Sequence, residues 1–238
     1  MSSEYLGGTF DILPPQERDR EKVEAAAKRI FGAAGYSRIE TPAFETTELF
    51  ARGVGESTEI VQKEMYSFED QGGRSLTLRP EGTAPVCRAY VEHGMHKLPQ
   101  PVKLWYLSNF FRAEAPQAGR FRQFWQVGAE SIGSDQPTVD AELILLLAEL
   151  LEELGVTDLR IRIASLGSSE ARAAYREKLS AFLRDRAEAI APEVRARIDL
   201  NPLRAFDSKD PGTQKVMESA PLLVDWISDE DREHFDTV

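Results

Sequence analysis

Two strand-like segments joined by a polar loop constrain the fold of this chain more than any other feature. The segments PVKLWYLSNFFRAE and RQFWQVGAESIG carry aromatic and aliphatic residues at strand density, and APQAGRFRQ between them contains Gly and Pro. This pattern predicts an antiparallel hairpin with a long loop. Because successive side chains of a strand point to opposite faces, Arg112 and Glu114 share one face of the first strand.

The second strand carries a matching set of residues on one face. These even-numbered positions are Phe124, Gln126, Gly128 and Glu130. If the loop is symmetric about Gly119, Arg112 lies opposite Gln126 and Glu114 lies opposite Phe124. Such a register would gather a cation, two carboxylates, an amide and an aromatic ring on one surface.

A face of this kind suits a small zwitterion bound beside a nucleotide. The guanidinium of Arg112 matches a carboxylate or a phosphate with two parallel donors, and Arg120 and Arg122 in the loop could reach further phosphates. The ring of Phe124 offers a surface for a base. Acceptors for an ammonium or an imidazole N–H come from Glu81, Gln126 and Glu130.

An amphipathic hairpin whose charges simply face water would give a similar pattern. Three features favour a binding face instead. The charges occupy a single face, the loop is rich in Arg and Gly, and Glu130 lies in an otherwise apolar strand.

Several segments together resemble a known family. They are GGTFDILP, YSRIETPAFETTELFARGVGE, IVQKEMYSFEDQGGRSLTLRPEGTAPVCRAY, FRAEAPQAGRFRQF and NPLRAFDSKD. In these segments the chain resembles the histidyl-tRNA synthetases, which are class II aminoacyl-tRNA synthetases. The second segment looks like class II motif 1, and the fourth looks like motif 2 with its loop. The resemblance covers nearly the whole chain.

The resemblance implies a histidine-binding role for the residues around RPEGT and the second strand. The α-amino group of histidine would be held by Glu81, Thr83 and Gln126, with Gly82 in the same segment. Glu130 would hold the imidazole. The substrate side chain would then be recognised by a carboxylate.

The same resemblance implies an ATP site next to the histidine site. Arg112 would be the catalytic residue and would bridge the histidine carboxylate and the α-phosphate, whose mutual repulsion opposes the reaction. The adenine amino group would meet Glu114, the adenine ring would stack on Phe124, and Arg120 or Arg122 would meet the phosphates. Mg²⁺ would accompany the ATP, and no bound prosthetic group or separate metal site is expected.

We predict an α+β fold in which a class II synthetase-like antiparallel sheet is flanked by helices and followed by a partial helical insertion subdomain. The sheet would consist of the strands 75–79, 102–112, 124–133 and 159–163. Helices are expected over 14–36 and 137–155, from apolar residues at helical spacing. The leucines of the second helix cover much of its circumference, which predicts burial on more than one side.

The domain assignment follows from the resemblance. Residues 1–167 would form the catalytic core with motifs 1 and 2, and residues 168–238 would begin the helical insertion, which could be loosely folded without its continuation. The sequence contains neither an RGLDYY-like segment, nor motif 3, nor an anticodon-binding domain. We therefore expect the N-terminal catalytic portion of a histidine–tRNA ligase, inactive or weakly active in isolation.

A second function stays open at this point. The chain could be a synthetase-like regulatory subunit of ATP phosphoribosyltransferase, which senses histidine. Such a sensor could keep Glu81, Gln126 and Glu130 but would have no use for the ATP-binding segment PQ-x-GR-x-RQF, most of which is present here. That segment favours the synthetase.

Composition narrows the partners and the compartment. The formal net charge of −11 argues against a nucleic-acid-binding surface over the whole chain, so any contact with tRNA(His) would be local to the loop. The single cysteine, Cys87, fits a reducing cytoplasm, and its simplest reading is a small side chain on the helix after PEGT. No signal peptide or membrane span is indicated. By resemblance, the region 45–53 contributes to a homodimer.

Overall fold

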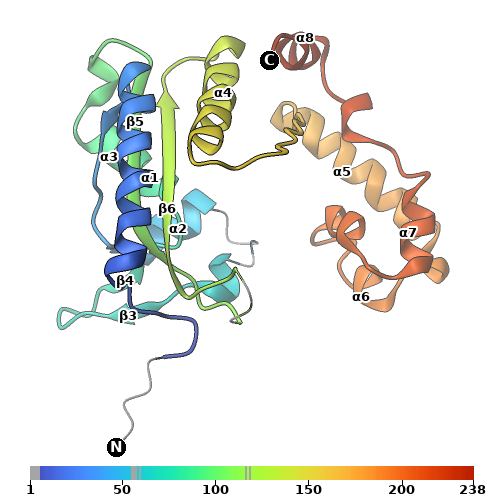
Figure 1. Ribbon diagram of the computed structural model, residues 1–238. Coiled ribbons are helices and arrows are strands. Elements are labelled where there is room, and N and C mark those ends of the chain that lie inside the picture. Colours follow the sequence, from blue (N-terminus) through green and yellow to red (C-terminus); the bar gives the residue numbers. More distant parts are fainter. Residues whose placement is uncertain (1–5, 55–57, 59, 116, 118) are drawn as a thin grey trace, which may run out of the picture. The chain divides into compact units, whose positions relative to one another are not determined.

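The computed structural model describes residues 6–54, 58, 60–115, 117 and 119–238. The chain forms two compact units. The first comprises Met1–Asp135 and Val139–Leu159, and the second comprises Gln136–Thr138 and Arg160–Val238. Mixed helices and strands (Figure 1) confirm the predicted α+β class. The assignment of residues 1–167 to a catalytic core and of 168–238 to an insertion remains a prediction.

The first unit holds all the strands that the structure describes. Its elements in chain order are α1 (Pro14–Ala33), β1 (Ser37–Arg38), β2 (Phe44–Thr46), α2 (Thr47–Val54), η1 (Ile60–Glu64), β3 (Ser67–Glu69), β4 (Ser75–Leu78), α3 (Thr83–Glu92), η2 (Met95–Lys97), β5 (Val102–Phe111), β6 (Gln123–Ile132) and α4 (Pro137–Glu153).

These strands form two small sheets rather than one. The order of the first sheet is β1-β5-β6, with β1 parallel and β6 antiparallel to β5. The second sheet is antiparallel with the order β2-β4-β3. The strand predicted at 75–79 is therefore present as β4, but it pairs with two three-residue strands that are too short to show a periodic pattern.

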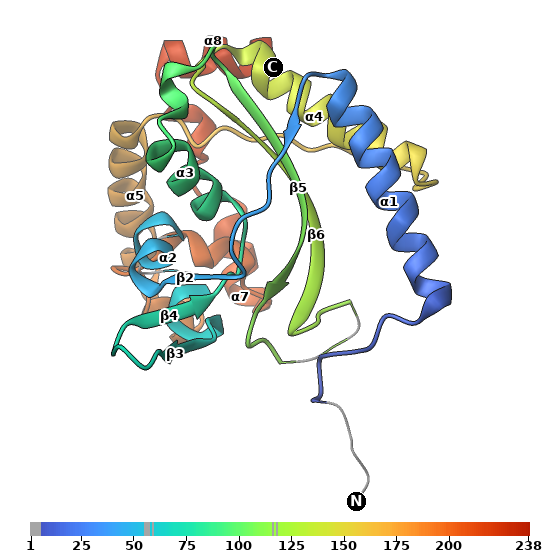
Figure 2. The same cartoon turned by 90° about the vertical axis from the view of Figure 1, so that its left-hand side faces the viewer.

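Within the first unit, the hairpin of β5 and β6 lies between α1 and α4 on one side and α3 on the other (Figure 2). Odd-numbered side chains such as Trp105 and Leu107 pack with α1 and α4 in one apolar cluster. Even-numbered side chains such as Tyr106 and Phe110 pack with Val86 of α3 in another. Burial of each large apolar side chain contributes roughly 1.5–3 kcal/mol, so both faces hold the hairpin in place. The even face is the one that carries the predicted site.

Helix α4 corrects one expectation. Its ends agree with the sequence signals, because it starts at Pro137 and is followed by Gly155, whose φ is +80°. Of its residues, however, only Leu146 and Leu150 are buried, while Leu145 and Leu147 are 66% and 53% exposed. The prediction of burial on more than one side is wrong, because α1 and the sheet cover one side only.

The predicted strand at 159–163 is also absent. These residues form no strand in the structure, and Leu159, Ile161 and Ile163 are 39%, 53% and 45% exposed. An alternating pattern describes side-chain faces, but a strand also requires a neighbour that completes its hydrogen bonds. None of the described strands pairs with this segment.

The second unit is helical and has its own core. Its elements are α5 (Ser169–Arg184), η3 (Ala187–Ala189), α6 (Pro192–Arg195), η4 (Pro202–Asp207), α7 (Pro211–Met217), η5 (Leu223–Asp225) and α8 (Asp229–Thr237). Tyr175, Leu179 and Leu183 of α5 pack with Ile198 and other buried residues. Packing of this kind contradicts the expectation of a loosely folded region. No helix among the described residues of either unit is long and apolar enough to cross a bilayer.

Candidate active site

The hairpin register differs from the prediction. Phe124 lies opposite Phe110 and Gln126 lies opposite Ser108, not opposite Glu114 and Arg112. The Arg112 amide donates to the Arg122 carbonyl (2.9 Å), in line with a pairing centred on residue 117 instead of Gly119, so each partner lies four positions from the assumed one. The cause is an asymmetric loop. A shift by an even number of residues preserves the faces within β5 and β6, so Phe124, Gln126, Gly128 and Glu130 share one face, whereas Arg112 and Glu114 lie beyond the end of β5 at Phe111.

Three of the predicted histidine-binding residues meet at the start of α3. The Thr83 hydroxyl donates to Glu130 Oε1 (2.8 Å), which connects α3 with β6. Glu81 accepts from the Thr83 amide (2.6 Å) and from the Ala84 amide (3.0 Å). The carboxylate of Glu81 thus lies at the positive end of the α3 helix dipole, where negative charge is favoured.

Burial raises the pKa of the Glu130 carboxyl, and the nearby charge of Glu81 raises it further. Hydrogen bonds from the hydroxyls of Thr83 and Tyr106 act in the opposite direction and favour the carboxylate. Glu130 is therefore a desolvated acceptor whose charge is supported by two neutral donors. Perturbed carboxyl groups of this type are concentrated at functional sites.

Tyr106 is a site residue that the sequence reasoning missed. Its hydroxyl donates to Glu130 Oε1 at 3.4 Å, and its ring lies over Gly128, its partner across the hairpin. The signal was an aromatic residue on the even face of the first strand, but its partner could not be recognised without the register.

Arg112 lies between the histidine-binding cluster and the proposed ATP face. Its Nε donates to the Pro80 carbonyl (2.9 Å), and its Cζ is 5.2 Å from the centroid of the Phe124 ring. Its Nη1 is 3.9 Å from Glu114 Oε1, beyond hydrogen-bond distance. Within the described part of the chain, neither Nη atom donates a hydrogen bond, which leaves both for an anionic ligand.

The two loop arginines differ in their surroundings. Arg122 is held by backbone carbonyls, because its Nε donates to Glu114 O (3.2 Å) and its Nη1 to Gly7 O (3.1 Å). The Arg120 side chain is 62% exposed and pairs with Glu114 at 3.2 Å. Of the two, Arg120 is the one placed to contact a ligand.

A pocket of about 290 Å³ lies beside this loop and is lined by Glu114, Arg120 and Lys63, among others. Lys63 adds a cation that the sequence reasoning missed. Gln126 lies on the same face of β6 and is exposed, and its side chain makes no hydrogen bond to another described residue.

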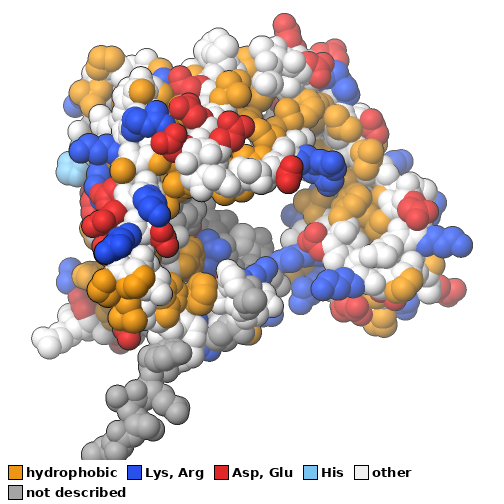
Figure 3. Space-filling model, viewed as in Figure 1, with side chains coloured by type: hydrophobic (Ala, Val, Ile, Leu, Met, Phe, Trp, Pro, Cys, Tyr) orange, Lys and Arg blue, Asp and Glu red, His pale blue; other side chains and the backbone are white. Residues whose placement is uncertain are grey.

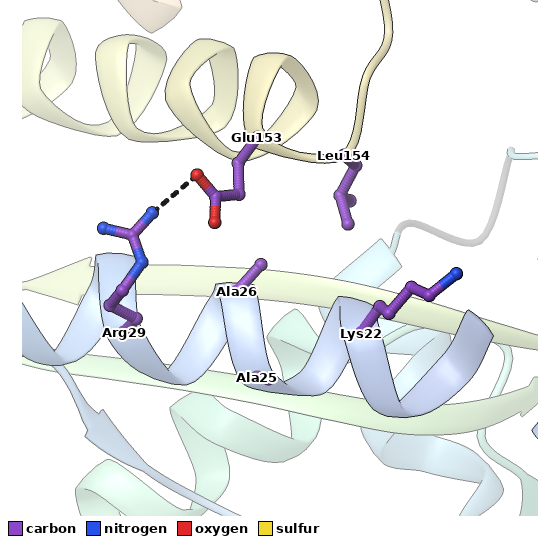
Figure 4. Close-up of a pocket in the computed structure, with 6 residues that line it drawn as sticks. All are labelled: Lys22, Ala25, Ala26, Arg29, Glu153 and Leu154. Carbon is purple, nitrogen blue, oxygen red and sulfur yellow. Dashed lines mark ion pairs between the residues drawn. The ribbon is translucent and has the colours of Figure 1, made fainter. Parts of the chain in front are cut away.

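A larger hollow of about 410 Å³ lies between α1 and α4, on the opposite face of the hairpin. Figure 4 shows the ion pair between Arg29 and Glu153 (2.9 Å) at its edge. It contains none of the predicted site residues. No group of three or more His, Cys, Asp or Glu side chains suited to a metal ion occurs among the described residues.

A family model described as histidyl-tRNA synthetase matches residues 8–187, which include every residue of the site. The chain belongs to the histidyl-tRNA synthetase family. It is 48% identical over 231 residues to a histidine–tRNA ligase of Halothermothrix orenii and covers 55% of that relative. It is 49% identical over 239 residues to the ligase of Geobacillus thermodenitrificans and covers 56% of it.

Solved structures support the same assignment. The apo histidyl-tRNA synthetase of S. aureus matches with a TM-score of 0.75 and 33% identity, covering 99% of this chain and 53% of that one. A protein described as an ATP phosphoribosyltransferase regulatory subunit/histidyl-tRNA synthetase from Bacillus halodurans C matches with a TM-score of 0.64 and 21% identity, covering 100% of this chain and 65% of that one. The second likeness shows a shared fold. The chain thus spans about half the length of the histidine–tRNA ligases it matches.

Proposed function

We propose that this chain is the N-terminal catalytic portion of a histidine–tRNA ligase and that it binds histidine and ATP for the formation of histidyl-adenylate. The observation that carries the proposal is the position of Arg112. Its Nε is bonded to the carbonyl of Pro80, directly before Glu81, while its guanidinium lies against the Phe124 ring. One cation therefore stands between a cluster of carboxylates and an aromatic surface.

Histidine binds through complementary charges in this proposal. Its ammonium group meets Glu81 and Gln126, and the Thr83 hydroxyl, which donates to Glu130, still has lone pairs to accept a further hydrogen bond. Gly82 belongs to the same histidine-binding segment, between Glu81 and Thr83. The imidazole N–H donates to Glu130.

ATP occupies the Arg112 side of the site. Adenine stacks on Phe124 and its amino group meets Glu114, while Arg120 contacts the phosphates and Arg122 holds the loop in place. Mg²⁺ would accompany the ATP phosphates, keeping several of its waters, and would reduce the negative charge on them.

The reaction is attack of a histidine carboxylate oxygen on the α-phosphorus. A bond forms between these atoms while the bond from the α-phosphorus to the bridging oxygen breaks, and pyrophosphate leaves. The two Nη atoms of Arg112, which donate no hydrogen bond to another described residue, hold carboxylate and α-phosphate together and offset their repulsion. Arg112 is accordingly the catalytic residue.

The wider context of the reaction is also proposed. Transfer of histidine to tRNA(His) belongs to the full-length ligase, and the contact made by this chain is local to the loop, because the chain has a formal net charge of −11. On the face shown in Figure 3, acidic and basic side chains are interspersed, without a continuous basic patch. We place the protein in the cytoplasm as a homodimer, with α2 and the preceding strand at the interface.

Ligand binding by the chain tests the proposal. Calorimetry should detect both histidine and ATP, with histidine binding weakened by Glu130→Ala and ATP binding weakened by Arg112→Ala. The variant Arg74→Ala removes an exposed arginine from the β3–β4 turn and should change neither affinity. Histidine-dependent ATP–pyrophosphate exchange, weak or absent in this chain, should be abolished by Arg112→Ala wherever it is measurable.

The alternative function rests on the shared fold with the regulatory-subunit structure. A histidine sensor would bind histidine but not ATP. Histidine binding without ATP binding would therefore favour the sensor, and binding of neither ligand would refute both functions.

A further inference from the structure

The ring of Tyr106 occupies a slot that only glycine permits on both sides. A Cβ atom added to Gly82, at the start of α3, would overlap the Cζ and hydroxyl oxygen of Tyr106. A Cβ added to Gly128 on β6 would overlap the same two atoms. Contacts this short are not tolerated, so any larger residue at either position must displace the phenol. Both glycines are therefore matched to this tyrosine.

The slot directs the hydroxyl of Tyr106 toward Glu130. The hydroxyl oxygen is 3.4 Å from Glu130 Oε1, and the Thr83 hydroxyl is 2.8 Å from the same atom. Burial, together with the negative charges of Glu130 and Glu81, raises the pKa of Tyr106. The phenol thus stays protonated and acts as a donor, since a carboxylate offers only acceptors.

The arrangement leaves the two carboxylate oxygens of Glu130 in different states. Both hydroxyl donors go to Oε1, and no group among the described residues donates a hydrogen bond to Oε2. A partly buried oxygen without a donor is an acceptor position that a ligand can fill. A ligand lacking an N–H at this point would leave the oxygen unpaired, which is how buried polar groups reject close analogues.

We propose that Tyr106 is a positioning residue: with Gly82, Gly128 and Thr83 it fixes Glu130 so that Oε1 is occupied and Oε2 accepts the imidazole N–H of the substrate. The inference rests on the proposed function for the identity of the substrate. Its structural part, the control of the Glu130 carboxylate by Tyr106, is testable without any ligand.

The ligand-free test is the titration of Glu130. The groups that face its carboxylate are Glu81, Thr83 and Cys87 from the start of α3 and Tyr106 from β5. Carbon-13 NMR would follow the Glu130 carboxyl, assigned by its loss in Glu130→Gln. Removing a donor should raise the pKa, so Tyr106→Phe should shift it upward and Thr83→Val further, because the threonine donor is closer.

Tyr90→Phe is the matched control, since the Tyr90 hydroxyl is bonded to Gln100 (3.1 Å) and not to the site. It should leave the Glu130 titration unchanged. An unchanged pKa in Tyr106→Phe as well would overturn the proposal. The conservative change keeps the ring in its slot, so the fold should be retained.

Histidine binding gives the second readout. Tyr106→Phe should weaken binding roughly 10- to 150-fold, the range expected for one hydrogen bond to a charged group. Gly128→Ala should weaken it at least as much although every hydroxyl is still present, because the ring is displaced. Full affinity for histidine in Gly128→Ala would refute the proposal that histidine binding depends on the position of the Tyr106 ring. Failure of the unmodified chain to bind histidine would refute the proposed function, whereas an unmoved Glu130 pKa would refute only the role of Tyr106.

Discussion

Arg79 is the most heavily bonded cation in the described part of the molecule, and its replacement gives the sharpest test of the fold. The residue is 3% exposed. Its Nε donates to the Asn109 carbonyl (2.8 Å) and its Nη2 to the Asn109 side chain (3.0 Å). Its Nη1 contacts Thr41 Oγ1 (3.2 Å) and the Pro42 carbonyl (3.4 Å). One guanidinium thus joins the end of β4 to β5 and to the loop before β2.

The perturbation is Arg79→Lys, which keeps the positive charge but replaces the planar guanidinium group by an ammonium group. An ammonium has three donors around one nitrogen and cannot reach acceptors on both sides of a guanidinium. Losing about two hydrogen bonds of a charged donor, at roughly 1.5–3 kcal/mol each, should lower the free energy of unfolding by about 3–6 kcal/mol. The pair with Glu40, whose side chain is 57% exposed, is screened by solvent and is not counted.

The assay is urea unfolding followed by tryptophan fluorescence. A Trp226→Phe background removes the tryptophan of the second unit, so that Trp105 and Trp125 report on the first unit alone. With a slope of about 2 kcal/mol per molar urea, the midpoint should fall by roughly 1.5–3 M. The control is Arg74→Lys, because the side chain of Arg74 is 77% exposed and its pair with Asp70 lies at the surface.

Two results would refute this reasoning. A midpoint that falls by no more than in Arg74→Lys would show that the buried hydrogen bonds contribute little. A large change in slope at unchanged midpoint would show that the substitution acts on the denatured chain instead.

Three further predictions concern pH and packing. Burial raises the pKa of Glu130, so the folded first unit binds a proton more readily than the unfolded chain. The free energy of unfolding of this unit should therefore fall as pH rises from the ordinary carboxyl range through the raised pKa. Glu130→Gln should reduce the corresponding fall in urea midpoint. Hydrogen bonds from Ser228 and from the Ser168 amide lower the pKa of Asp231. Near neutral pH, Asp231→Asn should therefore lower the urea midpoint of the second unit, read from Trp226 fluorescence. The difference in midpoint between the variant and the unmodified chain should vanish as acid protonates the native carboxylate. Leu179 is 0% exposed, and Leu179→Ala should lower the unfolding free energy of that unit by about 2–5 kcal/mol, whereas a matching Leu200→Ala, at a position 57% exposed, should have little effect on the same transition.

The faces of the hairpin were predictable from the sequence, and the register was not. Alternation has a period of two, so Phe124 and Glu130 must share a face wherever the pairing begins. The pairing itself depends on the loop, whose asymmetry carries no periodic signal. For the same reason Tyr106 was missed, because its importance depends on lying opposite Gly128 and near Glu130.

The structure also differs from the prediction where a sequence pattern implies contact with a neighbouring strand or helix. The alternation over 159–163 describes a strand only if a neighbouring strand completes its hydrogen bonds, and the described residues provide none. The leucines of α4 predicted burial on more than one side, yet a single layer of neighbours covers Leu146 and leaves Leu147 exposed. Sequence patterns indicate which side chains avoid water, but they do not supply the surface that covers them.

The contact of Glu81 with the first amides of α3 has a consequence for ligand affinity. A free glutamate side chain samples many rotamers, and immobilising one such side chain at an interface costs roughly 0.5–1.5 kcal/mol. Here the Thr83 and Ala84 amides already hold the carboxylate. The entropy is therefore lost when the chain folds, and an ammonium group that arrives later meets an acceptor that is already in position.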